Sequence, residues 1–272
     1  MNKHNPSFQF LWAALAFCIA VESSLAQSWT QTSAPLDNWA SVASSADGTH
    51  LVACGPGIYT STNAGATWAL SSAPSDYWTC VASSADGTHL VAGGSNIYTS
   101  ANSGLTWKNT SAPSGAWWSI ASSSDGTKLV AADSGSFDGA IYTSTNAGAS
   151  WRLTSAIPSQ SVASSADGTN LVAIALNGPI SISTNAGATW RLTSAPSNYW
   201  LSVACSADGT KLVAACWSTI YTSTNTGATW TLSSAPGAYW ESVASSADGT
   251  KMVAVASYGF ICTSTNSGVT WT

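Results

Sequence analysis

Charged side chains are scarce in this sequence, and basic ones are the scarcest. Asp, Glu, Lys and Arg make up 7% of the 272 residues, with 7 Lys and Arg against 12 Asp and Glu and a net charge of −5. The basic residues are scattered, so no basic stripe is present to neutralise a phosphate backbone. This excludes nucleic acid as a partner, while 15 Trp and 45% hydrophobic residues favour a globular all-β protein.

Long apolar runs are missing beyond the N-terminus. The apolar stretch from Phe8 to Val21 is shorter than the roughly 20 residues that a spanning helix needs. It follows a weakly basic start and precedes the small-x-small site Ser24-Leu25-Ala26, which predicts a secretory signal over residues 1–26. An uncleaved anchor is the alternative. We expect a secreted protein, extracellular or periplasmic, with one domain over residues 27–272 and no membrane span after cleavage.

Motifs for metals, nucleotides and other cofactors are absent. No Cys or His spacing matches a metal site, and no Gly-rich loop joins a strand to a helix, so we expect no cofactor. Without Cys18 of the leader an odd number of cysteines remains, so at least one is free or pairs between chains. The remaining cysteines are Cys54, Cys80, Cys205, Cys216 and Cys262. We expect most of them to pack in the interior as small apolar groups.

Two short phrases recur along the chain. STNAGATW at residues 61–68 has six copies with small changes, and SADGT places Asp at 47, 86, 125, 167, 208 and 248 (SSDGT at 125). A period near 40 residues in a sequence rich in Val, Ile, Thr, Tyr and Trp is typical of the four-stranded blades of a β-propeller. We call the eight-residue phrase the box and SADGT the rim turn, and expect both on one end of the propeller.

The chemistry of the box predicts a tight turn. The Asn63 side chain can accept from backbone N–H groups ahead of it, Gly65 accepts a positive φ, and Trp68 starts the next strand as an apolar slab. All six copies carry the same Asn and Trp. The Asn residues are Asn63, Asn102, Asn146, Asn185, Asn225 and Asn266, and the Trp residues are Trp68, Trp107, Trp151, Trp190, Trp230 and Trp271.

The pattern S-x-[D/N]-x-G-x-T-W resembles the Asp-box, or BNR, repeat of sialidase-like β-propellers and of the photosystem II assembly factor (Ycf48/Hcf136-like) domain. The resemblance covers nearly the whole of residues 27–272 and implies that the box is a structural turn away from the ligand. One departure is uniform, because Asn stands where the family usually has Asp. Asn keeps the accepting carbonyl and removes the charge.

The blade count follows from the strands. The chain ends directly after the sixth box, and residues 28–35 match residues 229–236, an outer strand that lacks its own blade. We therefore expect an all-β, six-bladed propeller in which the N-terminal strand, Trp29 to Ser33, completes the sixth blade and covers an open edge.

Sialidase chemistry, which the resemblance suggests first, needs an arginine cluster. Only Arg152 and Arg191 follow the leader, both directly after a box Trp, where we expect solvated outer strands. We therefore expect a non-enzymatic binding or assembly scaffold, acting as a monomer on a glycan or protein partner. The alternative is a glycan-active hydrolase or lyase that uses two of the carboxylates outside the rim turns. These are Asp37, Asp76, Asp133, Asp138 and Glu241.

The end of the propeller opposite the boxes differs in every repeat and is rich in aromatic residues. The Trp that enters most inner strands has two interpretations, a space filler between blades or a lining that stacks on sugars or grips a peptide. The aromatic residues outside the repeat pattern are the better ligand candidates. They are Trp118, Trp217, Tyr258, Phe137 and Phe260.

Two further sites stay open on the sequence. The loop from Asp133 to Gly139 has two carboxylates, Asp133 and Asp138, that suit calcium, although a solvated Gly-rich loop is the main alternative. Hairpin register places Cys54 and Cys80 at one level on neighbouring blades, where a disulfide can form. The same counting separates Cys205 from Cys216 by several residues of strand and rules out a bond between them.

Overall fold

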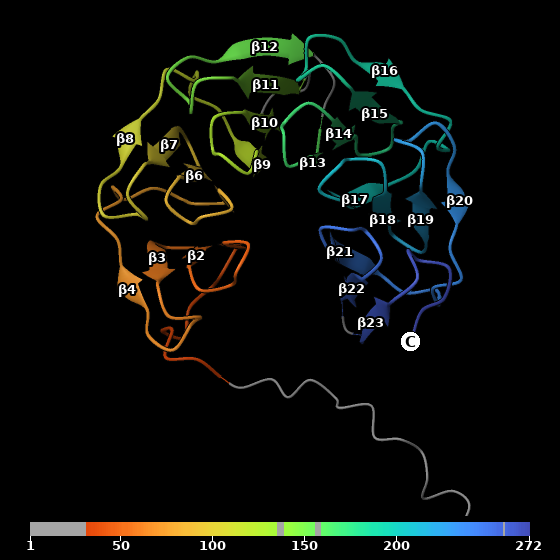
Figure 1. The fold of residues 1–272 in the computed structure, drawn as a ribbon, viewed down its shortest axis with the longest axis horizontal. Coiled ribbons are helices and arrows are strands. Elements are labelled where there is room, and N and C mark those ends of the chain that lie inside the picture. Colours follow the sequence, from red (N-terminus) through yellow and green to blue (C-terminus); the bar gives the residue numbers. More distant parts are fainter. Residues whose placement is uncertain (1–30, 135–138, 156–158, 258) are drawn as a thin grey trace, which may run out of the picture. The chain divides into compact units, whose positions relative to one another are not determined.

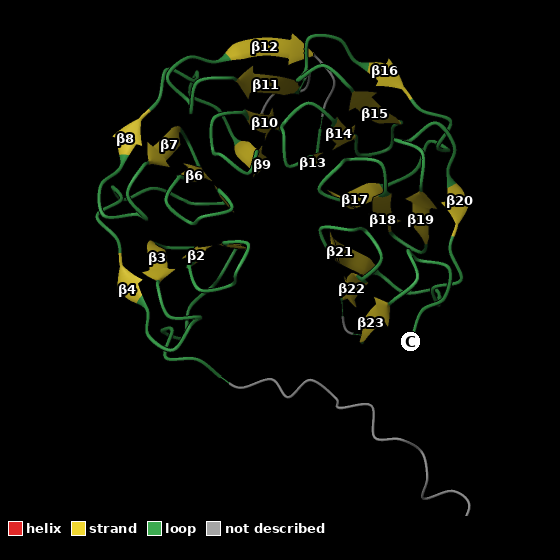
Figure 2. Ribbon diagram, viewed as in Figure 1, coloured by secondary structure: helices red, strands yellow, loops and turns green. Residues whose placement is uncertain are grey.

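The computed structural model describes residues 31–134, 139–155, 159–257 and 259–272. The chain divides into two units, Met1–Thr32 and Ser33–Thr272, and all strands of the described residues lie in the second. Its described residues form strands, turns and loops without helices (Figure 2). No helix among them is long and apolar enough to cross a membrane.

Six antiparallel sheets follow one another around a central axis in Ser33–Thr272, which confirms the six-bladed propeller (Figure 1). Each blade is an up-and-down meander running outwards from the axis. Blade one is β1 (Ser41–Ser44), β2 (Leu51–Cys54), β3 (Ile58–Ser61) and β4 (Ala69–Leu70). Blade two is β5 (Cys80–Ser83), β6 (Leu90–Gly93), β7 (Ile97–Ser100) and β8 (Lys108–Asn109). Blade three is β9 (Trp117–Ser122), β10 (Leu129–Asp133), β11 (Ala140–Ser144) and β12 (Arg152–Ser155).

The other three blades repeat this order. Blade four is β13 (Ser161–Ser164), β14 (Leu171–Ile174), β15 (Ile180–Ser183) and β16 (Arg191–Leu192). Blade five is β17 (Trp200–Cys205), β18 (Leu212–Cys216), β19 (Ile220–Ser223) and β20 (Thr231–Leu232). Blade six is β21 (Trp240–Ser245), β22 (Met252–Ala256) and β23 (Ile261–Ser264).

The boxes and the rim turns lie at one end of the propeller, as expected. In blade one the Ala64 N–H of the box donates to the Thr49 carbonyl of the rim turn at 2.9 Å, and the other five blades repeat this bond. We call this end the box face. The links between blades and the loops between the second and third strands form the opposite end, which we call the variable face.

Each box closes through its own side chains. Asn63 Oδ1 accepts from the Thr67 N–H at 2.9 Å, and Ser61 Oγ accepts from the Gly65 N–H at 2.9 Å. Gly65 has a φ of 83°, as expected, but Ala64 before it also has a positive φ of 55°. Asn63 Nδ2 donates to Thr67 Oγ1 at 2.9 Å, a bond that an ionised Asp has no proton to make.

Apolar clusters fill the five interfaces between successive blades. In each, Val and Ile side chains from the second and third strands of one blade contact the Trp, Val or Leu side chains of the next. The cluster between blades five and six, for example, joins Val213 and Ile220 to Trp240 and Val243. The propeller is therefore a row of similar interfaces rather than one central core.

Blade six differs from the others at its outer side. Thr272 exchanges two backbone hydrogen bonds with Thr263, at 2.8 and 2.9 Å, and so stands where the outer strand of the other blades begins. The predicted completion of this blade by Trp29 to Ser33 falls mostly outside the described residues, since the description starts at residue 31. It stays a prediction.

Candidate functional site

A pocket of about 480 Å³ opens at the axis of the propeller. Its walls are the first residues of the inner strands and the links before them, so all six blades contribute. Most of the lining is small or hydroxylic, because the inner strands place short side chains at or near their first residue, such as Ser41, Ser119, Ser161 and Ser202. The pocket opens on the variable face, where the sequence placed the ligand candidates.

Four larger side chains give this pocket its chemical character. They are Tyr77, Trp118, Gln160 and Glu241, each from a different blade or link. Trp118 is half exposed and Tyr77 is more exposed still, so both offer aromatic surface to solvent. Ser257 Oγ donates to Glu241 Oε1 at 2.5 Å, which holds the carboxylate in place. The pocket thus combines aromatic surface, an amide and one oriented carboxylate.

Three aromatic rings meet on the variable face around blade five. The Tyr199 and Trp217 rings are stacked with centroids 5.0 Å apart and 23° between their planes. Tyr239 meets Trp217 edge-on, with centroids 6.0 Å apart. Trp217 and Tyr239 are exposed. We call Tyr199, Trp217 and Tyr239 the aromatic stack.

The aromatic stack adjoins the pocket through the chain itself. Tyr199 is two residues before Leu201, and Tyr239 is two residues before Glu241, and both Leu201 and Glu241 line the pocket. The strand register shifts directly after Trp200 and after Trp240, so side-chain alternation does not decide how the stack and the pocket are oriented. The stack and the pocket are neighbours along the chain, and we take the two together as the candidate functional site.

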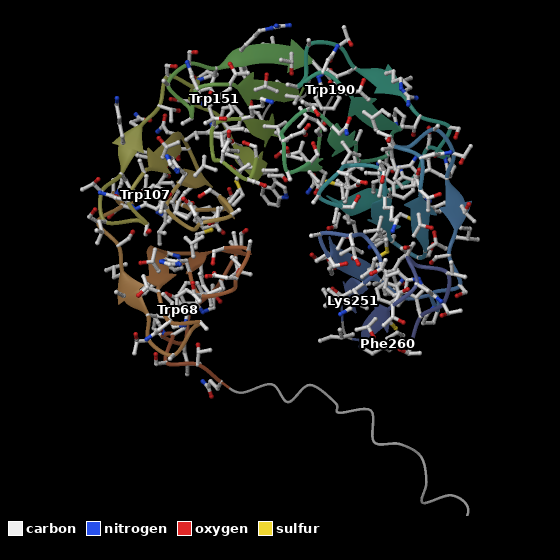
Figure 3. The ribbon with its side chains drawn as sticks, in the orientation of Figure 1. Trp68, Trp107, Trp151, Trp190, Lys251 and Phe260 are labelled. Atoms are coloured by element: carbon white, nitrogen blue, oxygen red, sulfur yellow. The ribbon has the colours of Figure 1, made fainter. Side chains whose placement is uncertain are left out.

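The predicted ligand residues divide into three groups. Trp118 lines the pocket and Trp217 is the centre of the aromatic stack, so the structure brings these two into the candidate site. Phe260 is half exposed and meets Trp240 edge-on at 5.9 Å on blade six (Figure 3). Phe137 and Tyr258 lie outside the described residues.

Sequence reasoning did not single out Tyr77, Tyr199 and Tyr239 as ligand residues. Each directly precedes a buried Trp that enters an inner strand: Trp78, Trp200 or Trp240. Because neighbouring residues in extended backbone point in opposite directions, burial of the Trp turns the Tyr outwards. The Tyr-Trp pairs were the signal that could have revealed these residues.

Four of the five repeated Trp residues that enter the inner strands are buried space fillers, as the first interpretation proposed, while Trp39 of blade one is 36% exposed. Trp78, Trp117, Trp200 and Trp240 are fully buried, and each of the first three meets a Tyr of the third strand edge-on at about 5.5 Å. The box Trp residues lie farther out, against the outer strands, as the labelled Trp68, Trp107, Trp151 and Trp190 show (Figure 3).

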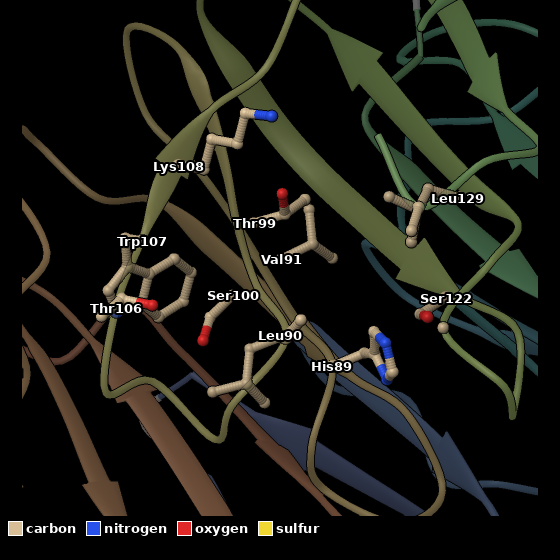
Figure 4. Close-up of a pocket in the computed structure, with 13 residues that line it drawn as sticks. His89, Leu90, Val91, Thr99, Ser100, Thr106, Trp107, Lys108, Ser122 and Leu129 are labelled. Atoms are coloured by element: carbon tan, nitrogen blue, oxygen red, sulfur yellow. The ribbon is translucent and has the colours of Figure 1, made fainter. Parts of the chain in front are cut away.

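A second pocket, of about 260 Å³, lies between blades two and three near the box face (Figure 4). Leu90, Thr99 and Trp107 of blade two and Leu129 of blade three line it. The matching space between blades four and five measures only about 10 Å³. The pocket is lined by residues that every blade repeats for packing, so we regard it as incomplete packing of one interface rather than as the functional site.

The carboxylates and cysteines outside the site have local partners. Asp76 accepts from Ser95 Oγ at 2.7 Å, and Asp133 accepts from the Ala116 N–H at 3.0 Å. Asp138, the other acid of the proposed calcium loop, lies outside the described residues, and the described ones contain no group of three potential metal ligands. Cys54 and Cys80 are free buried thiols, so the candidate disulfide is not formed.

Other details agree with the sequence. Ser41 pairs with Cys54 in the counted register, and Cys216, which pairs with Trp200, lies at the far end of its hairpin from Cys205. Arg152 and Arg191 are exposed on outer strands, away from the pocket.

No family model matches the chain, and no curated protein matches it. The box sequence therefore remains a resemblance to the BNR repeat and the sialidase-like superfamily rather than a demonstrated membership.

Solved structures do match the fold. The chain is similar to the GH74 enzyme of Niastella koreensis, with a TM-score of 0.68 and 20% identity over 86% of this chain and 38% of that one. It is also similar to YCF48 bound to D1 peptide, with a TM-score of 0.67 and 15% identity over 89% of this chain and 83% of that one. YCF48 from Cyanidioschyzon merolae gives the same TM-score with 17% identity, over 89% and 87% of the two chains.

These neighbours correct one expectation. The prediction that the protein is not an enzyme is wrong as an inference from this fold, because GH74 enzymes are among its structural neighbours. The missing arginine cluster argues against a sialidase only. The chain spans less than two fifths of the GH74 enzymes that it matches, and at these identities the likeness establishes the fold alone. What the findings establish is a β-propeller of the architecture shared by GH74 enzymes and YCF48.

Proposed function

We propose that the protein binds a carbohydrate chain across its variable face, along the aromatic stack and into the axial pocket. The observation that carries this proposal is the stack itself, in which Trp217 contacts both Tyr199 and Tyr239, with ring centroids 5.0 and 6.0 Å away. Flat rings that are exposed on a rigid scaffold suit the C–H faces of sugar rings. Buried rings serve packing instead, as the repeated Trp residues do.

The polar groups of the pocket support a neutral, hydroxyl-rich ligand. Gln160 and the serines that start the inner strands donate and accept hydrogen bonds, and Glu241 accepts only. No Lys or Arg is among the described residues that line the pocket, so none of these can hold an anionic ligand by its charge. A sugar chain satisfies such a lining better than a phosphate or a carboxylate does.

Binding to a panel of neutral polysaccharides, measured by affinity electrophoresis, tests the proposal. Trp217→Ala and Trp118→Ala should each weaken binding by about 10-fold or more, equivalent to roughly 1–3 kcal/mol for an anchor ring. Leu70→Ala is the matched control, since Leu70 is an exposed apolar residue on an outer strand. If a peptide library binds to the same face and no glycan does, the carbohydrate proposal fails.

Hydrolysis of the bound chain is a second candidate function, favoured by Glu241. Its carboxylate lines the pocket and is oriented by Ser257, and the GH74 neighbours are enzymes. Glycoside hydrolysis usually needs a second carboxyl group, and Glu241 is the one carboxylate among the described residues that line this pocket. If the protein hydrolyses glycans, Glu241→Gln should abolish the release of reducing ends and leave binding intact.

A further inference from the structure

Blades one and six each have one sheet face that no other blade covers. Successive inner strands contact each other five times, β1 with β5, β5 with β9, β9 with β13, β13 with β17 and β17 with β21. Among the described residues β21 and β1 are not such a pair, and the two blades stand apart in Figure 1. The five interfaces between successive blades therefore serve as the reference for the two uncovered faces.

The apolar side chains on these two faces are exposed. Val42 of β1 is 68% exposed, whereas the residues at its position in the other blades are 5–7% exposed. Ile261 of β23 is 53% exposed, whereas its five counterparts are at most 1% exposed. The Val42 counterparts are Val81, Ile120, Val162, Val203 and Val243, and those of Ile261 are Ile58, Ile97, Ile141, Ile180 and Ile220.

Hydrogen bonds that recur between successive blades are also missing at these two faces. At the five interfaces the N–H of the residue before the rim Asp, Ala in every turn but the third, where it is Ser124, donates to the carbonyl of the matching residue in the next blade at 2.7–2.8 Å. No described acceptor meets the Ala247 N–H. Lys211 Nζ donates to the Asp248 carbonyl at 2.8 Å, whereas Lys251 on blade six (Figure 3) makes no such bond in the described part of the chain.

The glycine of the first rim turn shows the same vacancy. A Cβ built on Gly87 would lie 2.4 Å from His50 Cβ of the preceding blade, and the other four rim glycines are equally close to a neighbour. A Cβ on Gly48 would meet nothing within 4 Å. In the other blades this space is filled by the side chain of the residue that follows Asp-Gly-Thr in the preceding blade.

The contacts of Ser33 indicate a preceding blade other than blade six. Ser33 Oγ donates to the Ala66 carbonyl at 2.9 Å, as Ser72, at the end of the outer strand of blade one, donates to Leu105 at 2.7 Å. Ser33 therefore ends the outer strand of the blade before blade one. Blade six begins an outer strand of its own at Thr272, and Trp271 already holds its box position.

We propose that the two uncovered faces bind a three-stranded antiparallel sheet of this same repeat, supplied by another polypeptide segment. Its Val and Ile side chains would cover Ile261 and Val42. Its rim turn would accept from the Ala247 N–H and place a long side chain against Gly48. This differs from the closure expected from the sequence, in which residues 29–33 complete blade six and the two blades meet directly.

Extending the chain tests the fit. A copy of residues 192–223, which carries one outer-strand end, one link and three strands, is appended after Thr272. The extended chain should melt higher by at least about 5 °C and should resist proteolysis within the added unit. An appended segment of the same composition in scrambled order is the control and should leave Tm unchanged. If the true repeat is cleaved away and Tm stays the same, the proposal is overturned.

Cross-linking the unextended chain distinguishes the occupants. A Cβ on Gly126 would lie 3.4 Å from Ser84 Cβ across an existing interface, close to the span of about 3.5–4.5 Å in a disulfide. A Cβ on Gly126 would also lie 2.4 Å from His89 Cβ, so the control carries His89→Gly as well. In that background, Ser84→Cys with Gly126→Cys should form an intrachain disulfide on mild oxidation. The matched pair Ser246→Cys with Gly48→Cys, in a Lys251→Gly background, should not. An intrachain disulfide in this second pair would show direct closure, and an interchain one would show that a second copy occupies the faces; either result overturns the proposal.

Discussion

At the residue scale, each box holds a residue that is not glycine in the left-handed backbone conformation. Their φ angles lie between 53° and 58°, and Thr226 is the one β-branched member. Branched residues resist this conformation most. We expect Thr226→Gly to stabilise the protein by about 0.5–1 kcal/mol in urea unfolding, since relief of strain exceeds the added freedom of the unfolded chain.

The control for this variant lies in the same box. Thr224 is exposed and is not among the residues with positive φ, so Thr224→Gly should destabilise by a similar amount through unfolded-state entropy alone. Equal unfolding midpoints for the two variants would show that Thr226 carries no strain.

Thiol reactivity is a second prediction at this scale. Burial raises the pKa of Cys54, Cys80 and Cys205 to about 12, so few thiolates form at neutral pH. We expect negligible alkylation of these three residues in the native protein and complete alkylation after unfolding without reductant. Peptide mapping that finds Cys54 and Cys80 still protected in the unfolded protein would instead reveal the disulfide.

At the scale of elements, the rim turns make the stability of the fold depend on pH in the acid range. Asp47 Oδ1 accepts from Ser45 Oγ at 2.6 Å and from the Thr49 N–H and hydroxyl at 2.9 and 2.8 Å. These bonds, the Ser hydroxyl first, lower the pKa of Asp47 from 3.8 to about 2, and the other five rim Asp carboxyls shift in the same direction.

A carboxyl whose pKa is lower in the folded state stabilises the fold above its unfolded pKa, and this contribution disappears as pH falls through the folded value. The urea midpoint should therefore be flat from pH 5 to 7 on account of these groups and should fall between pH 4 and pH 2. Asp125→Asn keeps an accepting oxygen without a titrating group, so this variant should lose less stability over that interval. An identical acid profile for both proteins would contradict the assignment.

The box Trp residues are a second feature at this scale. Trp190 packs against the cluster of Val130, Ile141 and Val162, and its Nε1 donates to Thr154 Oγ1 at 3.3 Å. Trp190→Ala should cost about 3 kcal/mol or more in unfolding free energy and leave carbohydrate affinity per folded molecule unchanged. Trp190→Phe, which keeps most of the contact, should cost clearly less. A loss of affinity with no loss of stability would place the ligand near the boxes.

At the scale of the whole molecule, similar units serve different purposes at the two ends. The box face repeats the same turns around the ring, so it offers little by which a partner could be distinguished. The variable face collects the residues that differ between units, including Trp118, Trp217 and Glu241. A scaffold of nearly identical interfaces thus leaves one end free to vary without loss of packing.

The sequence by itself determined the repeating unit, the strand order and the turn chemistry. These depend on contacts within a few residues, such as Asn63 with Thr67 and Asp47 with Thr49, which an eight- or five-residue phrase contains in full. It also indicated Trp118 and Trp217, because they depart from the repeat. It did not reveal that the Tyr before each buried Trp turns outwards to the ligand side.

Only the tertiary structure decided which rings meet and which faces stay open. Tyr199, Trp217 and Tyr239 belong to links and loops of blades four, five and six, so their stacking depends on how neighbouring blades are placed. Val42 and Val81 occupy the same position in their repeats, yet one is exposed and the other buried. The physical reason is that the neighbouring blade buries these side chains. The sequence of a repeat does not show whether such a blade packs against it.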